Sequence, residues 1–311
     1  MPDPAEPSLL LPGLDGSNPL AFLAALGTLR TLTLALPDET VRMSWEPHDG
    51  AWRPRVWCSA IDRDAVLIET LDNVLAEAKN RVCFQIGDNL NLPAASFRVF
   101  LLDAINNSAS FTQPGDRTDS DFFAAFGSDA IVDDKGVMAD TALRTMSGAG
   151  HQHFLKFFRE LVERTEADHL ERALLRTWDY ADEGRGLNLR WDPADDRRYA
   201  VRWQNPSADP NMTMRGANRL AIEALPLLPT APDRGRIVTT AFEGKGARDT
   251  YFTWPIWSPS LSLEVVSSLL ANVPAMQRRP EHRVALGIEA LIRSARITTG
   301  KFRNFTPGVA V

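Results

Sequence analysis

The first hydrophobic pattern in the chain follows a loop rich in glycine and proline at residues 13–19. Ser17 or Asn18 can cap a helix there, and Pro19 suits its first position because a proline has no N–H to leave unpaired. The following apolar residues lie on all sides of a helix, which is typical of a buried one. They are Leu20, Phe22, Leu23, Leu26, Leu29 and Leu32. The pattern predicts a buried helix over residues 20–34.

The rest of the chain mixes helical and strand patterns. Alternation predicts strands over 41–45 and 53–58 with a turn at 48–50, a hairpin of 187–191 with 199–203, and strands over 237–242 and 251–254. Helical spacing is seen over 64–78, 154–162, 166–177, 217–225, 261–272 and 280–296, while 98–105 fits a strand or a helix. Without regular βαβ alternation, the predicted fold class is mixed α+β, with short antiparallel strands.

An acidic, glycine-interrupted segment at residues 116–140 divides these elements. We interpret it as a surface excursion and expect a boundary near residue 147. Residues 1–147 then form an acidic α+β region with the buried first helix. Residues 148–311 form a more basic α+β region that ends in helices. A single continuous domain is the alternative.

Charge separates the two halves of the chain more sharply than the formal net charge of −6 suggests. Residues 1–150 hold 11 Lys and Arg against 21 Asp and Glu, whereas residues 151–311 hold 23 against 19. This asymmetry indicates a basic surface for an anionic partner in the second half, with an acidic region elsewhere. Two ordinary solvated surfaces are the alternative.

Cysteine content and hydropathy favour a cytoplasmic protein. The two cysteines, Cys58 and Cys83, fit no metal or redox motif, and so few cysteines suit a reducing compartment. No window approaches the about 18 consecutive apolar residues of a membrane span, and the acidic, proline-rich N-terminus is unlike a secretion signal. We therefore expect no membrane partner.

The basic residues of the second half are the candidate nucleic-acid contacts. Arginines alternate with aromatic residues, which can stack bases and bind phosphates, although the same alternation allows the aromatics to be core. Two further arginines lie at a helix start, where phosphate oxygens bind well, and residues 276–303 carry seven cations against two acids. The candidates are Arg190, Arg197, Arg198, Arg202, Arg215, Arg219, Arg278, Arg279, Arg283, Arg293, Arg296, Lys301 and Arg303.

No catalytic signature stands out. The chain has no phosphate loop, dinucleotide fingerprint or nucleophile elbow, so we expect neither enzyme activity nor a cofactor. His151 and His153 could bind a metal together with carboxylates of the acidic segment. Two exposed polar residues near a helix start are the simpler interpretation of this pair.

Four blocks of the sequence resemble CRISPR-associated proteins of subtype I-G, formerly I-U. They are residues 13–27 (GLDGSNPLAFLAALG), 189–193 (LRWDP) continued by 196–200 (DRRYA), 216–226 (GANRLAIEALP) and 253–257 (TWPIW). They occur in the family's order, and together they are more specific than any one of them. The family's large subunits are usually much longer than this chain.

The resemblance implies a non-catalytic subunit, large-subunit-like or accessory, of an RNA-guided DNA surveillance complex in antiviral defence. Its partners would be the other effector subunits and guide RNA, target DNA or both. In such complexes base pairing reads the sequence, while protein contacts the backbone and a short motif. Two alternatives remain open. One is a metal-dependent hydrolase that uses His151 and His153, and the other is a protein-interaction module that binds no nucleic acid.

Overall fold

The computed structural model describes residues 7–108, 117–146, 153–182, 187–195, 213–244, 249–299 and 302–311. These residues form helices and small antiparallel sheets, so the predicted mixed α+β class is confirmed. Of the candidate residues, Arg197, Arg198, Arg202 and Lys301 lie outside the described residues, as does His151.

The predicted first helix is present as α1 (Pro19–Ala35). Its N-cap is Asn18, whose side-chain oxygen accepts hydrogen bonds from the N–H groups of Leu20 at 2.9 Å and Ala21 at 3.3 Å. Residues 19–32 are all buried, as an all-round apolar helix requires. Gly27 lets α7 (Arg215–Ile222) approach, because a Cβ at this position would lie 1.8 Å from the carbonyl oxygen of Leu220. The α1–α7 pair is therefore the central element of the fold.

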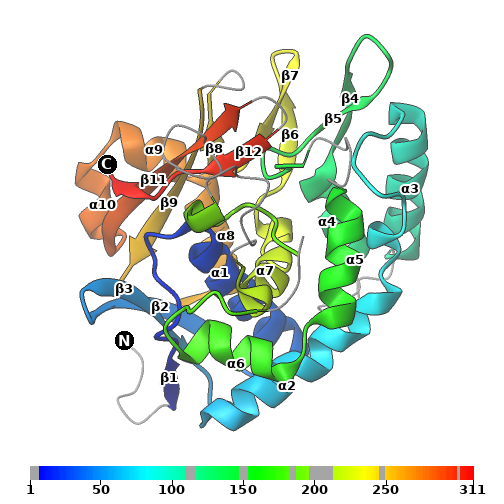
Figure 1. The fold of residues 1–311 in the computed structure, drawn as a ribbon. Coiled ribbons are helices and arrows are strands. Elements are labelled where there is room, and N and C mark those ends of the chain that lie inside the picture. The colour runs from blue at the N-terminus through cyan, green and yellow to red at the C-terminus, as the bar shows by residue number, and fades with distance from the viewer. Residues whose placement is uncertain are drawn as a thin grey trace, which may run out of the picture.

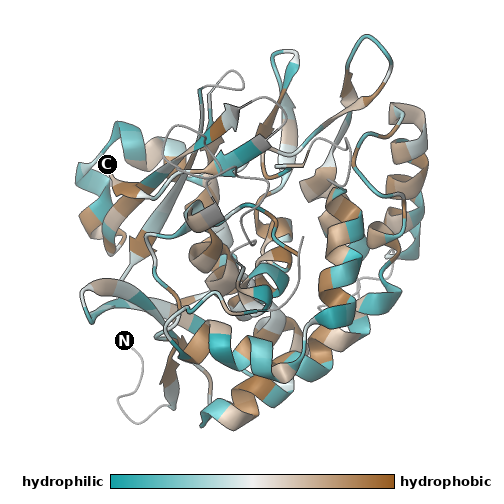
Figure 2. Ribbon diagram, in the orientation of Figure 1, coloured by the Kyte–Doolittle hydropathy of each residue, from teal (hydrophilic) through white to brown (hydrophobic). Residues whose placement is uncertain are grey.

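The remaining helices surround this pair (Figure 1). On one side are α2 (Asp64–Ala76), α3 (Ala94–Asn107), α4 (Thr118–Phe126), α5 (Phe154–Arg164) and α6 (Ala167–Leu175). On the other are α8 (Leu263–Ala271), α9 (Val273–Arg278) and α10 (Glu281–Ala285). Figure 2 shows hydrophobic residues on α3 at the outer edge of the molecule, where Val99 and Leu102 are exposed.

Two antiparallel sheets complete this second side of the molecule. The first has the order β1 (Ser8–Leu10), β3 (Ala51–Trp57), β2 (Arg42–His48) and β10 (Leu261–Ser262). The second has the order β12 (Phe302–Phe305), β11 (Ile288–Thr299), β9 (Thr250–Trp257) and β8 (Phe242–Glu243), and β13 (Val309–Ala310) also pairs with β11. Hairpins β4 (Gly127–Val132) with β5 (Met138–Asp140) and β6 (Thr230–Asp233) with β7 (Arg236–Thr239) lie beside α4.

Buried residues from both predicted regions belong to one hydrophobic core. Strand β10, from the second region, pairs with β2 from the first, so the packing does not follow the predicted division at residue 147. Within the described residues, no helix is both long and apolar enough to cross a membrane.

Three local predictions are wrong. Residues 288–299 form β11 rather than the end of a helix over 280–296, because they pair along most of their length with β9. Residues 187–191 form no strand; Trp191 is core, and its indole N–H donates to the Leu143 carbonyl at 2.9 Å. The segment 116–140 is not only a surface excursion, since Phe122, Phe123 and Phe126 are fully buried in α4.

Candidate nucleic-acid interface

Arg219 is a correction to the predicted set of nucleic-acid contacts. Its side chain is 1 % exposed, and its Nη1 lies 2.8 Å from Oε1 of Glu223, four residues further along. Its Nη2 donates to the carbonyl oxygen of Leu75 at 3.1 Å. A buried guanidinium needs a counter-charge and hydrogen-bond acceptors, and Glu223 and the Leu75 carbonyl of α2 supply both to Arg219. The Arg219 side chain therefore does not reach a polyanion on the surface.

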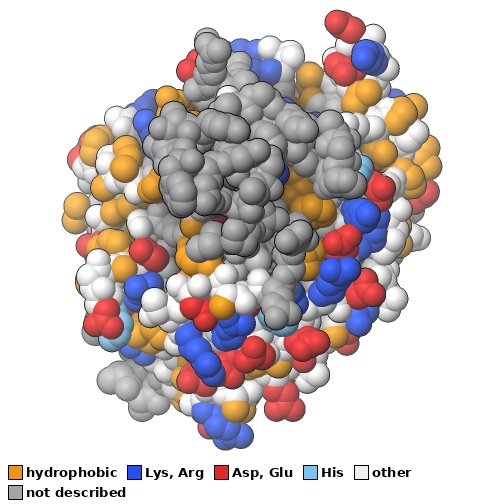
Figure 3. All heavy atoms as spheres, in the orientation of Figure 1, with side chains coloured by type: hydrophobic (Ala, Val, Ile, Leu, Met, Phe, Trp, Pro, Cys, Tyr) orange, Lys and Arg blue, Asp and Glu red, His pale blue; other side chains and the backbone are white. Residues whose placement is uncertain are grey.

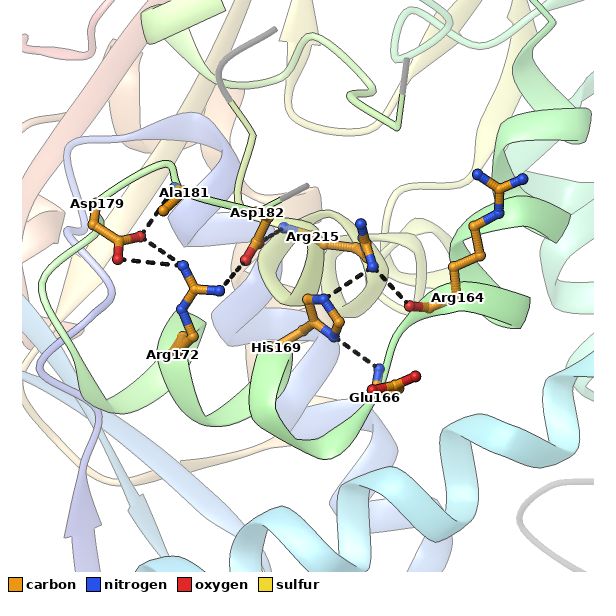
Figure 4. Close-up of polar contacts among 8 residues, drawn as sticks. All are labelled: Arg164, Glu166, His169, Arg172, Asp179, Ala181, Asp182 and Arg215. Carbon is orange, nitrogen blue, oxygen red and sulfur yellow. Dashed lines mark hydrogen bonds and ion pairs between the residues drawn. The ribbon is translucent and has the colours of Figure 1, made fainter. Parts of the chain in front are cut away.

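Arg215 lies in a network at the start of α7 (Figure 4). Its own backbone N–H donates to Oδ2 of Asp182 at 2.5 Å, and Arg172 lies 2.6 Å from the other oxygen of this carboxylate. The Arg215 guanidinium contacts Nε2 of His169 at 2.9 Å and the Arg164 carbonyl at 3.0 Å. The helix start thus carries a carboxylate from this chain in the place where a phosphate was expected.

Arg190 is half-buried, and its backbone has a φ of 58°, in the left-handed region. The side-chain oxygen of Asn188 accepts from its N–H at 2.6 Å, which supports this turn. Arg190 is therefore not in an extended strand, and the predicted alternation of arginines and aromatics along a hairpin strand is interrupted at this residue. The assignment of Arg190 to nucleic acid stays a prediction.

The C-terminal cations do not share one surface, because the predicted helix is a strand. Arg293 and Arg296 are an odd number of residues apart on β11, so they point to opposite faces of the sheet. Arg293 lies 2.6 Å from Oε1 of Glu243 and over the ring of Tyr251. Arg278 at the end of α9 and Arg279 directly after it are exposed, while Arg283 of α10 donates to the carbonyls of Met276 and Val311.

Arg296 and Arg303 meet on the other face of the sheet. Arg303 pairs with Thr298 in the β11–β12 register, two residues from Arg296, so the two arginines are diagonal neighbours on one face. Arg144 joins them from the loop after β5. Arg303 donates to the Arg144 carbonyl at 3.1 Å, and Arg296 donates to the Ala142 carbonyl at 2.6 Å. We call Arg144, Arg296, Arg303 and Asp140 the open cluster.

The open cluster holds three guanidinium groups against one carboxylate. Arg144 lies 2.7 Å from Oδ2 of Asp140 and also contacts Asn91. Among the described residues, the Nε groups of Arg144 and Arg296 are buried without a hydrogen-bond partner. Buried donors without acceptors are costly. Arg296 and Arg303 as whole side chains are only half-buried, so an anion could contact their exposed atoms but not the enclosed Nε groups.

Electrostatics make the open cluster cationic. Burial, together with the neighbouring Arg303, lowers the pKa of Arg296 to about 10, and burial and Arg144 lower that of Arg303. Burial raises the pKa of Asp140 in spite of the arginines around it. At neutral pH the arginines remain charged and repel one another. A bound anion would relieve this repulsion and would also hydrogen-bond to the guanidinium groups.

A second group of three arginines surrounds Glu223 near the end of α7. Arg30 lies 3.3 Å, Arg81 2.5 Å and Arg219 2.8 Å from the carboxylate oxygens of Glu223. Glu223 itself is 1 % exposed. We call these four residues the closed cluster, because a single buried carboxylate receives all three guanidinium groups.

Aromatic packing and nearby carboxylates complete the closed cluster. Arg30 and Arg81 each lie against the ring of Phe122, at 5.5 and 5.3 Å from its centroid. A cavity of about 740 Å³ opens beside Arg30, and its lining contains more acidic than basic side chains. These acidic residues are Glu39, Asp121 and Glu264. The cavity is thus a poor site for a phosphate.

The described residues of the four sequence blocks lie together in the core, while residues 196–200 of the second block lie outside the described part of the chain. Asn18 of the first block donates to Oδ1 of Asp192 in the second at 3.1 Å, across 174 residues of sequence. The third block contributes Asn218, whose side chain accepts from the Leu189 N–H at 2.9 Å. The fourth contributes Trp254, which donates to the Gly16 carbonyl at 2.8 Å. The block residues in these contacts are scaffold residues, and the open cluster lies outside the blocks.

His153, the described member of the candidate metal pair, contacts an asparagine. Its Nδ1 lies 3.0 Å from Nδ2 of Asn89, whose oxygen accepts from the Phe154 N–H at 2.7 Å. His153 therefore helps to hold the Asn89 side chain that caps the start of α5. In the part of the chain that the structure describes, no group of three or more potential ligands could hold a metal ion.

Sequence reasoning missed Arg144 and Asp140. Arg144 reaches the C-terminal arginines across more than 150 residues of sequence, so no local pattern predicts the group. Comparison of the chain with protein-family models and with curated proteins gives no match.

Proposed function

We propose that the chain is a non-catalytic subunit of a CRISPR RNA-guided DNA surveillance complex of subtype I-G, and that it contacts the nucleic-acid backbone through the open cluster. The observation that carries the contact is the set of three arginines that share the single carboxylate of Asp140, with Arg296 and Arg303 half-buried on one face of the sheet. The order of the four sequence blocks supports the family assignment. The other effector subunits and guide RNA, target DNA or both are its partners in this proposal.

The open cluster suits backbone contact rather than reading of bases. Guanidinium groups hydrogen-bond to phosphate oxygens in a fixed planar geometry, and such contacts position a protein without carrying sequence information. The Ala142 and Arg144 carbonyls hold Arg296 and Arg303, so both groups lose little further freedom when they bind. Sequence recognition would then rest with the guide, as in other RNA-guided complexes.

The chemistry of the open cluster also favours binding over catalysis. A guanidinium stays protonated at neutral pH and therefore cannot act as a general base. The pKa of Arg296, lowered to about 10, still leaves it charged at pH 7. The arginines can neutralise phosphate charge but cannot activate a water molecule for hydrolysis.

A salt titration tests the proposal. The effector complex is assembled with the wild-type subunit or with Arg296→Gln/Arg303→Gln, and target DNA affinity is measured from low to moderate salt. Each lost phosphate contact should flatten the slope of log affinity against log salt by about 0.7–0.9. The double variant should thus flatten it by roughly 1.4–1.8, with little change in sequence preference.

The matched control is Arg63→Gln/Arg234→Gln, because both side chains are largely exposed and remote in sequence from the open cluster. This control should keep the wild-type slope. An unchanged slope in the Arg296→Gln/Arg303→Gln complex, with assembly intact, would contradict backbone contact at the open cluster. DNA cleavage by the chain alone, lost in His153→Ala, would contradict the non-catalytic role and favour the hydrolase.

A further inference from the structure

The arginines of α9 and α10 lie among exposed hydrophobic side chains. Val284 is 84 % exposed and Leu286 is 44 % exposed, both within or just after α10. On the adjoining strand β13 and after it, Val309 is 60 % and Val311 is 43 % exposed. Single exposed apolar residues are ordinary, but several together in one place indicate an interaction site.

These side chains lie on one side of the sheet. Val309 pairs with Arg293 in the β11–β13 register, so the two point to the same face. Gln277 of α9 donates to the Thr253 hydroxyl at 3.4 Å, and Thr253 pairs with Arg293 on that face too. Arg283 of α10 donates to the Val311 carbonyl at 2.9 Å, which joins α10 to the strand. The helices and the C-terminal residues thus form one continuous surface.

We call this surface the C-terminal patch, consisting of Arg278, Arg279, Arg283, Val284, Leu286, Val309 and Val311. Figure 1 places the chain end beside α9 and α10, and Figure 3 shows hydrophobic side chains at this edge of the molecule. By contrast, Figure 3 shows acidic and basic side chains intermixed over the lower helices. Between residues 278 and 283 the patch carries three arginines and one glutamate.

We propose that the C-terminal patch is a docking surface for an acidic segment of another protein that inserts at least one large apolar side chain. We expect the partner segment to be acidic because Arg278 and Arg279 are exposed and have no ion pair among the described residues. The exposed valines favour a protein over a nucleic acid as the partner of the patch. Protein interfaces are enriched in arginine around an apolar centre, whereas nucleic-acid interfaces are more polar.

This inference does not rest on nucleic-acid binding at the open cluster, which lies on the opposite face of β11. Arg293 belongs to the face of the patch, and Arg296 belongs to that of the open cluster. The two surfaces are therefore separable by mutation, and an assembly subunit could use both at once.

The test compares two probes on the full chain. One is a short fluorescein-labelled peptide of glutamate and leucine, and the other is a labelled single-stranded DNA oligonucleotide. Val284→Ser should weaken peptide binding about tenfold, because burial of a valine contributes about 1.5 kcal/mol. Arg278→Ala/Arg279→Ala should weaken it by a similar factor. Versions of the peptide with lysine for glutamate, or serine for leucine, should bind at least tenfold more weakly.

The matched controls change equally exposed side chains that lie outside the C-terminal patch. Val99→Ser alters another exposed helical valine, and Arg63→Ala/Arg234→Ala alters two other exposed arginines. Both should leave peptide affinity unchanged, and every variant should keep the wild-type melting temperature because its side chain is exposed.

Three outcomes would overturn the proposal. The first is peptide affinity that Val284→Ser does not change. The second is DNA affinity that falls in Arg278→Ala/Arg279→Ala but not in Val284→Ser, which would assign the patch to nucleic acid. The third is a wild-type dimer that Val284→Ser converts to a monomer, which would assign it to a second copy of the chain.

Discussion

The closed cluster and the open cluster have the same composition, three arginines and one carboxylate. They differ in how many of the arginines contact the carboxylate. In the closed cluster every guanidinium group contacts Glu223 directly. In the open cluster only Arg144 forms an ion pair with Asp140, while Arg296 and Arg303 are held by backbone carbonyls. The first arrangement satisfies its charges within the chain, and the second leaves charge available for a partner.

The pKa values of the two carboxylates express the same difference. Burial alone would raise the pKa of Glu223, but Arg81, Arg219 and Arg30 outweigh it and hold the pKa at about 2. For Asp140, burial prevails over its arginines and the pKa is raised. The position of the guanidinium groups, rather than their number, therefore decides whether the carboxylate charge of such a cluster is stabilised.

The largest effect should follow from removal of the carboxylate charge in the closed cluster. Glu223→Gln leaves three buried guanidinium groups without a counter-charge, and breaking a buried pair costs about 3–5 kcal/mol. Urea unfolding monitored by circular dichroism measures this loss. Asp140→Asn is the matched change in the open cluster and should cost less than about 1 kcal/mol, because burial already disfavours the charge of Asp140 and mainly a hydrogen bond to Arg144 is lost. Equal losses in the two variants would erase the distinction between the clusters.

The pH dependence of stability should have opposite signs for the two carboxylates. Because the folded pKa of Glu223 is about 2, below its ordinary 4.5, its contribution of about 3 kcal/mol is present above pH 4.5 and is lost toward pH 2. The raised pKa of Asp140 gives a contribution that is present below pH 3.8 and is lost as pH rises through the folded pKa.

Urea titrations of the wild type, Glu223→Gln and Asp140→Asn across acidic pH check both signs. The advantage of the wild type over Glu223→Gln should shrink with acid. Its stability relative to Asp140→Asn should rise with acid. A pH-independent difference in the first comparison would mean that Glu223 is not paired as described.

The smallest effect should come from a simple anion. Pyrophosphate at several times its dissociation constant should raise the melting temperature of the free chain by about 1–2 °C, because binding to the folded state contributes about 1 kcal/mol. The rise should disappear in Arg296→Gln/Arg303→Gln and persist in Arg30→Gln, relative to each variant's own baseline. A rise that survives in the first variant would place the anion elsewhere.

Much of the local structure was predictable from the sequence. The cap at Asn18, the proline at the first helical position and the apolar run gave α1 correctly. The turn at Asp49 and Gly50, both at positive φ, gave the β2–β3 hairpin. These elements depend on neighbouring residues, which is why local propensity was sufficient for them.

The helix predicted over residues 280–296 shows where local patterns fail. Leu286, Ile288, Leu291 and Ile292 fit an apolar helical face as well as they fit a buried strand. Pairing with β9 decides for the strand, and such tertiary context outweighs propensity. Gly287, at a φ of 67°, was the one available signal, since a glycine in this conformation commonly ends a helix.

The sequence by itself determined that cations are concentrated in the second half and that the first helix is buried. Only the tertiary structure decided which arginines are accessible. Arg219 is buried because Glu223 neutralises it, whereas Arg296 and Arg303 meet an arginine more than 150 residues away and share a single carboxylate. Burial of a charge depends on the partners that folding brings to it, and a pattern of neighbouring residues contains no information about partners so distant in the chain.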